Sequence, residues 1–304
     1  MIVRSGQRSR AATALRNRRG TVATGAVGDD PVLDDDRTKP SVRKAVARRK
    51  VAGTNGNGKL STRTPEAYLH KATHAQTPTD RAKYATRGLA QPGLDDTTQA
   101  MLLRQLYLAH MEGRRFELAL EVSRKMIDLR VLPDAARQDA ARACLGLGRP
   151  SDAISHLRVA GRVAPASRRA FHAWTLGSTL YLLGRETEAV GPLERALRWS
   201  TNAQPLYAAQ LALAQLGAGE PHESLRVLWD ALHDAPCGQG YGQFVLGELA
   251  CKLGENQEAR RCLEGFIRRT NSGRVALAVG LSAEVRRAEA LLEELPPESS
   301  RSSQ

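Results

Sequence analysis

The chain has 304 residues, a formal net charge of +13 and only 4% aromatic residues. This length suits two average domains or one elongated array, and the composition favours helices packed through small and aliphatic side chains. The longest apolar run, VALAVGLSAEV at 275–285, is too short to cross a bilayer. The first residues hold no uninterrupted apolar core of the kind a secretory signal needs. We therefore expect no membrane partner.

Residues 1–60 are predicted to form a disordered basic arm. They hold fourteen Lys and Arg against five Asp, and they show no sustained apolar period that could build a core. The acidic residues gather in DDPVLDDD (29–36) and the basic ones in RKAVARRK (43–50). Two interpretations stay open, a solvated tail or a handle for an acidic partner or nucleic acid. Because the arm has no aromatic residue, such nucleic-acid contacts would reach phosphates without sequence specificity.

Residues 61–98 are predicted to form an N-terminal helical hairpin or cap. TPEAYLHKATHA begins with a Thr cap and a first-turn Pro, and TPTDRAKYATRGLAQPG predicts a second short helix. His70 and His74 lie at i and i+4, a spacing that can hold a metal. No HExxH glutamate and no third ligand accompany them, so we expect no metal site and no cofactor.

Residues 99–274 contain about five copies of one pattern. Fragments such as LGRPSDAISHL (147–157) and LGRETEAVGPL (183–193) share a Gly turn, a polar helix start, a small residue and a Leu four positions later. The small residues are Ala119, Ala153, Ala189, Ser224 and Ala259, and they are spaced by 34 to 36 residues. A small residue in the second helix lets the first helix approach closely. The period therefore predicts pairs of antiparallel helices.

Two copies also carry Leu-Gly in the first helix, at Leu176–Gly177 and Leu246–Gly247. With the small residues, this pattern resembles the tetratricopeptide repeat (TPR) family, W-x₂-L-G-x₂-Y…A-x₃-F…P over 34 residues. The chain departs from the motif because leucines replace the Phe and Ala173 stands in the Trp position. The resemblance implies an all-α, right-handed α-solenoid of antiparallel helix pairs. We expect a capping helix over 275–296 to cover its last apolar face, and a disordered tail over 297–304.

One stretch, PCGQGYGQF at 236–244, suggests a phosphate loop beside a nucleophile when it is considered alone. A phosphate loop needs a preceding strand and a Gly-Lys-Ser/Thr ending, and both are missing. The repeat period places the three glycines in the joint between two repeats. Cys237 would lie near a helix N-terminus, which can lower a thiol pKa. No local base accompanies it and no acid/base pair is discernible elsewhere, so we expect no enzyme.

The four cysteines form no CxxC pair. Their scarcity indicates reduced thiols and a cytoplasmic location.

The TPR resemblance further implies a concave groove lined by one face of each first helix, which would bind a peptide or an amphipathic helix. The residues that it places there are Met101, Arg104, Leu108, Met111, Arg142, Phe171, Trp174, Tyr181, Leu206, Leu213, Tyr241, Phe244 and Lys252. A non-enzymatic scaffold or adaptor for another protein is the function that we expect. These side chains could instead pack against the next repeat or a terminal helix, and that alternative stays open. A nucleic-acid-associated or regulatory protein, with the arm on phosphates and the repeats recruiting a partner, is the second function considered.

Overall fold

The computed structural model describes residues 64–297, and within that range helices joined by turns make up the chain, with no strand. The helices are α2 (Pro65–Thr73), α3 (Pro78–Leu89), α4 (Asp96–Glu112), α5 (Phe116–Leu129), α6 (Pro133–Gly146), α7 (Pro150–Val163), α8 (Ala166–Leu182), α9 (Glu186–Trp199), α10 (Gln204–Gly217), α11 (Leu225–His233), α12 (Tyr241–Leu253), α13 (Asn256–Ser272), α14 (Val275–Gly280) and α15 (Ser282–Glu294). The predictions for the basic arm, and for the tail beyond Pro297, lie outside the described residues.

The first three helices begin where side-chain caps are available. The Thr64 hydroxyl accepts a hydrogen bond from the Ala67 amide at 3.3 Å, and the Thr77 hydroxyl accepts one from Asp80 at 3.1 Å. The Asp95 carboxylate caps α4 by accepting from the amides of Thr97 and Thr98. These caps satisfy backbone N–H groups that would otherwise lack partners at the helix starts. The Thr cap and first-turn Pro expected of α2 are confirmed, and α3, predicted only as a second short helix, begins in the same way.

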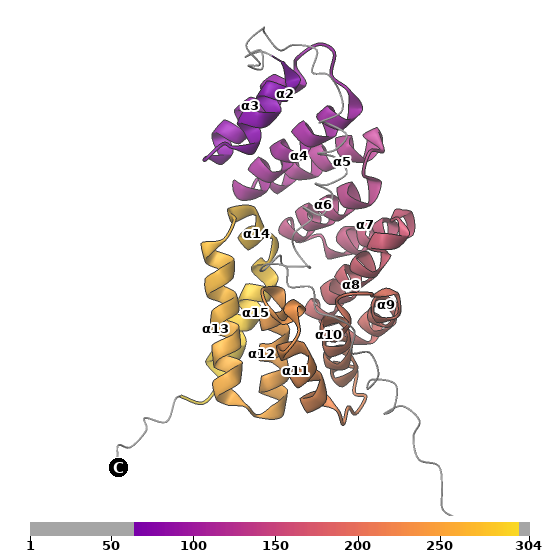
Figure 1. Ribbon diagram of the computed structural model, residues 1–304, viewed down its shortest axis with the longest axis vertical. Coiled ribbons are helices and arrows are strands. Elements are labelled where there is room, and N and C mark those ends of the chain that lie inside the picture. The colour runs from indigo at the N-terminus through magenta and orange to yellow at the C-terminus, as the bar shows by residue number, and fades with distance from the viewer. Residues whose placement is uncertain (1–63, 298–304) are drawn as a thin grey trace, which may run out of the picture.

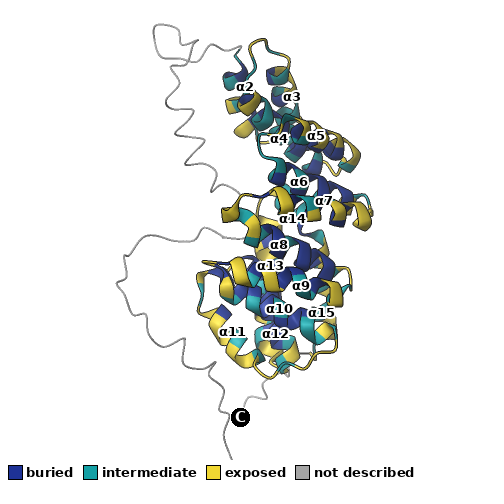
Figure 2. Cartoon of the chain, turned by 90° about the vertical axis from the view of Figure 1, so that its right-hand side faces the viewer, coloured by how far each residue is buried: buried dark blue, intermediate teal, exposed yellow. Residues whose placement is uncertain are grey.

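The helices stack as consecutive pairs along one curved array (Figure 1). Each of the pairs α4–α5, α6–α7, α8–α9, α10–α11 and α12–α13 packs on itself and on the next pair, while α2 and α3 precede them and pack on α4. Figure 2 shows the buried residues along the interfaces between the stacked helices. The helix pairs predicted from the repeat period are confirmed, as is the all-α solenoid that the TPR resemblance implied.

The small residues and glycines of the repeat work as the pattern predicts. Ala119, Ala153, Ala189 and Ala259 are completely buried. A Cβ atom added to Gly177 would lie 2.5 Å from Cγ of Leu193, the leucine of the same repeat's second helix. Gly247 meets Leu263 in the same way. The leucine of each of these two repeats therefore fills the space that the glycine leaves open.

The fourth repeat departs from the prediction. Ser224 was expected inside the second helix, but α11 begins only at Leu225 and Ser224 is exposed. The result is a short helix of nine residues with Val227 67% exposed. Polar and turn-forming residues precede it in the run GAGEPHES, and Gly219 has a φ of +85°. These residues favour a longer connection over an early helix start.

The C-terminal segment reaches further than a cap on the last repeat. α15 packs on both α12 and α13, while the short helix α14 contacts α4 at the opposite end of the repeat array. In Figure 1 the yellow helices α14 and α15 lie on the inner side of the curve, opposite α6 and α8. The C-terminal helices of the same chain therefore cover the inner side of the curved array. None of the helices within residues 64–297 combines the length and apolar character needed to cross a membrane.

Candidate functional site: the concave face and its helix α15

The first helices of the repeats, α4, α6, α8, α10 and α12, line the concave face, and α15 lies on it. A polar cluster of three residues links α15 to this face. The Arg287 guanidinium on α15 donates to the Glu248 carboxylate on α12 and, at 3.0 Å, to the Tyr181 hydroxyl on α8. The Tyr181 hydroxyl in turn donates to Glu248 at 3.1 Å, and the guanidinium carbon lies 5.0 Å from the Tyr181 ring centre. Charge-assisted bonds of this kind fix an orientation as well as a contact.

An aromatic cluster lies beside this polar one, within the face itself. The ring centre of Trp174 is 4.9 Å from that of Tyr241 and 5.8 Å from that of Tyr207. The Trp174 indole N–H donates to Oε1 of Gln210 at 2.6 Å. Phe244 completes the cluster 5.7 Å from Tyr241 and is fully buried. These rings join α8, α10 and α12 to one another.

The thirteen residues predicted to line the groove therefore divide by exposure. Met111, Trp174, Tyr181, Leu206, Leu213, Tyr241 and Phe244 are buried; Met101, Arg104, Leu108, Arg142 and Phe171 are half-buried; Lys252 is exposed. Packing against neighbouring repeats and a terminal helix, the alternative left open by the sequence, accounts for the buried set. Among the described residues 64–297, these seven side chains are therefore not available on an open surface in this conformation.

Glu284 of α15 is buried against the same face. Burial raises the pKa of its carboxyl to about 7, and the negative charge of Glu248 adds to the rise, while Arg142 and Arg286 oppose it. Burial also raises the pKa of Glu248, against the lowering effect of Arg287, Tyr181 and Lys252. Two carboxyl groups thus share one poorly solvated region. Arg142, a half-buried residue of the predicted groove, lies close enough to α15 to lower the pKa of Glu284.

Replacing Glu284 with glutamine is expected to stabilise the fold above neutral pH. The folded-state pKa of about 7 exceeds the ordinary 4.5, so folding takes up a proton between these values. The contribution of Glu284 to stability therefore falls as pH rises from about 4.5 to about 7. Thermal melts followed by circular dichroism should show the variant a few degrees above wild type at pH 8, and little different at pH 4.5. Exposed Glu289, changed to glutamine on the same helix, is the control; an equal shift at both pH values would contradict the assignment.

A second polar cluster joins the second and third repeats, and sequence reasoning missed it. The Asp134 carboxylate accepts from Nε and Nη2 of Arg168 at 2.7 and 2.8 Å, and Nε2 of His172 lies 2.9 Å from it. Burial opposes ionisation of Asp134, yet the bonds from His172 and Arg168 hold its pKa well below the usual range. Asp134 and Arg168 are 34 residues apart. Opposite charges one repeat period apart were therefore the signal in the sequence that could have pointed to this ion pair.

The stretch PCGQGYGQF is a joint with a buried thiol. Residues Pro236–Gly238 form one 3₁₀ turn, and α12 begins at Tyr241. Cys237 is 2% exposed, and burial raises the pKa of its thiol although backbone hydrogen bonding acts in the opposite direction. The expectation of a thiol with a lowered pKa is therefore wrong, because desolvation outweighs the backbone hydrogen bonds that favour the thiolate. Within residues 64–297, no cluster of three His, Cys, Asp or Glu side chains has a geometry suited to a metal ion.

No family model matches the chain, and no curated protein matches it. Among solved structures, the chain is similar to the C-terminal part of a TPR repeat-containing protein from Cytophaga hutchinsonii, with 13% sequence identity and a TM-score of 0.45. The similarity covers 78% of this chain and 96% of that one.

Proposed function

We propose that the chain is a protein-binding helical scaffold whose concave face takes an amphipathic helix from a partner, and that α15 occupies this place in the absence of one. The observation that carries the proposal is the seat of α15. A helix lies on the face with one arginine, Arg287, directed at a carboxylate and a tyrosine hydroxyl from two different repeats. The face thus has the shape and the polar groups that a helix needs.

The chemistry of the face defines the partner. Glu248 is 3% exposed, and its Oε2 atom has no hydrogen-bond partner among the described residues. The Nε2 group of Gln210 on the neighbouring α10 is likewise buried without a partner in that range. A buried polar atom left unpaired costs free energy. A partner helix with an arginine, and with an acceptor for Gln210, would satisfy more of the face than α15 does.

The position of α15 is suited to exchange because only two of its residues are buried. Only Glu284 and Ala288 are buried within α15, and one of them is a carboxylic acid that burial keeps from ionising freely. No residue of α14 is buried, and Val275 is 55% exposed. Val285, Leu291 and Leu292 of α15 do pack on the core, but they are only half-buried, so they give less hydrophobic stabilisation than fully buried side chains would. A partner helix with larger apolar residues would compete well against this intramolecular one.

The test uses a labelled synthetic peptide of residues 278–296 as the probe, added to the full-length chain. Ala288 is fully buried, so Ala288→Arg should eject α15 from its seat. We expect the peptide to bind this variant at least tenfold more tightly than wild type, because the intramolecular helix no longer competes. Fluorescence anisotropy measures the binding. The same peptide with alanine at Arg287 should bind the variant weakly.

Ala290→Arg is the matched control, because Ala290 is an exposed alanine on the same helix. It should bind the peptide no better than wild type. If Ala288→Arg proves too disruptive to the fold, the milder variant Arg287→Ala tests the same binding position of α15. A folded Ala288→Arg variant, checked by circular dichroism, that ignores the peptide would refute a helix-binding concave face.

The second function considered, nucleic-acid contact through residues 1–60, concerns residues outside the described range. No observation on the repeats favours it. It stays a prediction, with salt-dependent binding that disappears without the arm as its signature.

A further inference from the structure

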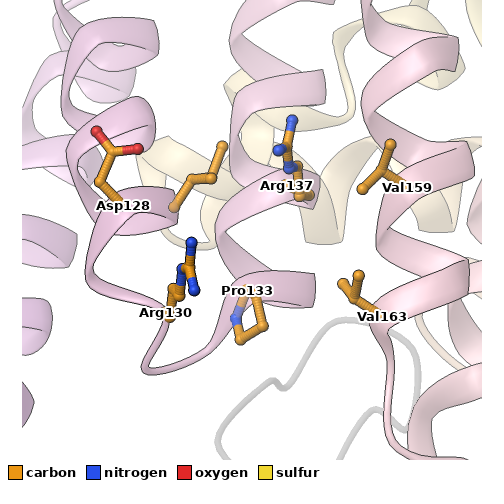
Figure 3. Close-up of a pocket in the computed structure, with 7 residues that line it drawn as sticks. Asp128, Arg130, Pro133, Arg137, Val159 and Val163 are labelled. Carbon is orange, nitrogen blue, oxygen red and sulfur yellow. The ribbon is translucent and has the colours of Figure 1, made fainter.

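A separate groove lies on the outer surface, between the second helices of the first two repeats. Its wider part is a cavity of about 480 Å³, between the end of α5, the start of α6 and the end of α7. Figure 3 shows Asp128 and Arg130 on one side, Pro133 and Arg137 in the middle, and Val159 and Val163 on the other. A second, smaller hollow shares Arg137 and Val159, so the groove continues along α5 and α7. This volume is in the range of sites that hold ligands or peptide side chains.

The groove combines an apolar wall with an excess of positive charge. Ile127, Pro133 and Val159 are half-buried, and Val163 is 45% exposed. Arg124, Arg130 and Arg137 line it, against the carboxylates of Asp128 and Asp152.

His156 lines the smaller hollow together with Arg124 and Arg137, two of the positive side chains of the groove. Burial lowers the pKa of His156, which lies 3.4 Å from the Arg137 guanidinium, and the charges of Arg137 and Arg124 lower it further while Asp152 opposes them. The groove therefore favours an acidic occupant with apolar side chains.

The chain contains one segment with this chemistry outside the described residues. All five acidic residues of the first sixty lie in 29–36, where DDPVLDDD sets Val32 and Leu33 between two groups of aspartates. Elsewhere in those sixty residues the charges are basic. The segment is thus complementary to the groove in both charge and apolar character.

The intervening chain is long enough to bring the two together. Residues 37–63 separate the acidic segment from Thr64, and 27 residues span at most about 90 Å when extended. The path from α2 to the groove crosses the stacked helices α3, α4 and α5. At spacings of about 8–10 Å between packed helices, that path is roughly 30 Å.

We propose that residues 29–36 dock in this outer groove, with Val32 and Leu33 against Val159 and Val163 and the aspartates beside Arg130 and Arg137. An acidic, apolar segment of another protein would compete for the same place. The groove is distinct from the concave face, so neither proposal depends on the other.

The test places the photocrosslinking residue p-benzoylphenylalanine at Leu33 in the full-length chain. After irradiation, mass spectrometry of the digested monomer should map crosslinks to residues 127–137 and 156–163. Arg130→Glu should lower their yield about fivefold, since it replaces an attraction to the aspartates by a repulsion. Raising the salt concentration should lower the yield as well. Arg130 is exposed, so its replacement should leave the helical spectrum unchanged.

Arg198→Glu is the control, because Arg198 is an exposed arginine in the last turn of α9, away from the groove. Its crosslink yield should equal that of wild type. Crosslinks that map to another surface, that form between two copies and vanish on dilution, or that persist unchanged in Arg130→Glu would each overturn the proposal. A chain that gives no crosslink would do the same.

Discussion

Replacing Asp134 with alanine is expected to destabilise the fold by about 3–5 kcal/mol, because it leaves buried charge and hydrogen-bonding capacity without a partner. The Asp134 carboxylate is 1% exposed, and it holds both Arg168 and His172 of the next repeat. Nδ1 of His172 already lacks a partner among the described residues. Removing the carboxylate would leave both ring nitrogens unpaired and the Arg168 fork facing empty space.

Urea denaturation followed by circular dichroism measures the loss. Asp128→Ala, which removes an exposed aspartate from α5, should change stability by less than about 0.5 kcal/mol. The double variant Asp134→Ala with Arg168→Met should recover part of the loss, because the unpaired guanidinium is gone. A loss below about 1 kcal/mol for Asp134→Ala would mean that water replaces the carboxylate, and that the cluster does not hold the second and third repeats together.

The repeat pattern was predictable because each small residue lies where two helices pack so closely that a larger side chain would clash. Ala153 or Ala189 must be small wherever two helices approach closely, and Leu193 must fill the space over Gly177. The same steric requirement recurs from one helix pair to the next, so small residues appear in the sequence at a regular spacing. Ser224 satisfied the period but not the helix start, since turn-forming residues before it delay α11.

The contents of the concave face were not predictable in the same way. The TPR resemblance implies that Tyr181 and Tyr241 lie on that face, but it carries no information about which other segment covers them. The pairing of Arg287 with Glu248 and Tyr181 joins residues 39 and 106 positions apart. A contact between the last helix and the middle of an array depends on the curvature of the whole array. The small rotations between successive repeats set that curvature.

The hydrogen bonds and ion pairs between neighbouring repeats were predictable only in part. The residues of Asp134–Arg168 and Trp174–Gln210 are separated by 34 and 36 positions, about one repeat. Many residue pairs share that spacing, and only the packed structure selects the two whose side chains meet. Cys237 illustrates the opposite limit. Its place beside a helix start was predictable, whereas the burial that raises its thiol pKa depends on the packing of α10, α11 and α12 around the 3₁₀ turn.

Replacing Gly242 with alanine is expected to cost about 3 kcal/mol, a large effect for a single methyl group. Gly242 lies in the first turn of α12, and a Cβ atom there would overlap the backbone carbonyl oxygen of Cys237. A backbone atom cannot rotate away as a side chain can, so the 3₁₀ turn or α12 must shift. Thermal or urea unfolding measures the loss.

Gly161→Ala is the matched control, because both glycines are helical and an added Cβ at Gly161 has nothing within 4 Å. Removing this helical glycine should stabilise the chain by about 0.5–1 kcal/mol. The same chemical change is thus expected to act with opposite sign at the two positions. If Gly242→Ala were neutral, the close approach of Cys237 to α12 would be absent in solution. Residues 236–244 would then be a loose connection instead of a packed joint between the fourth and fifth repeats.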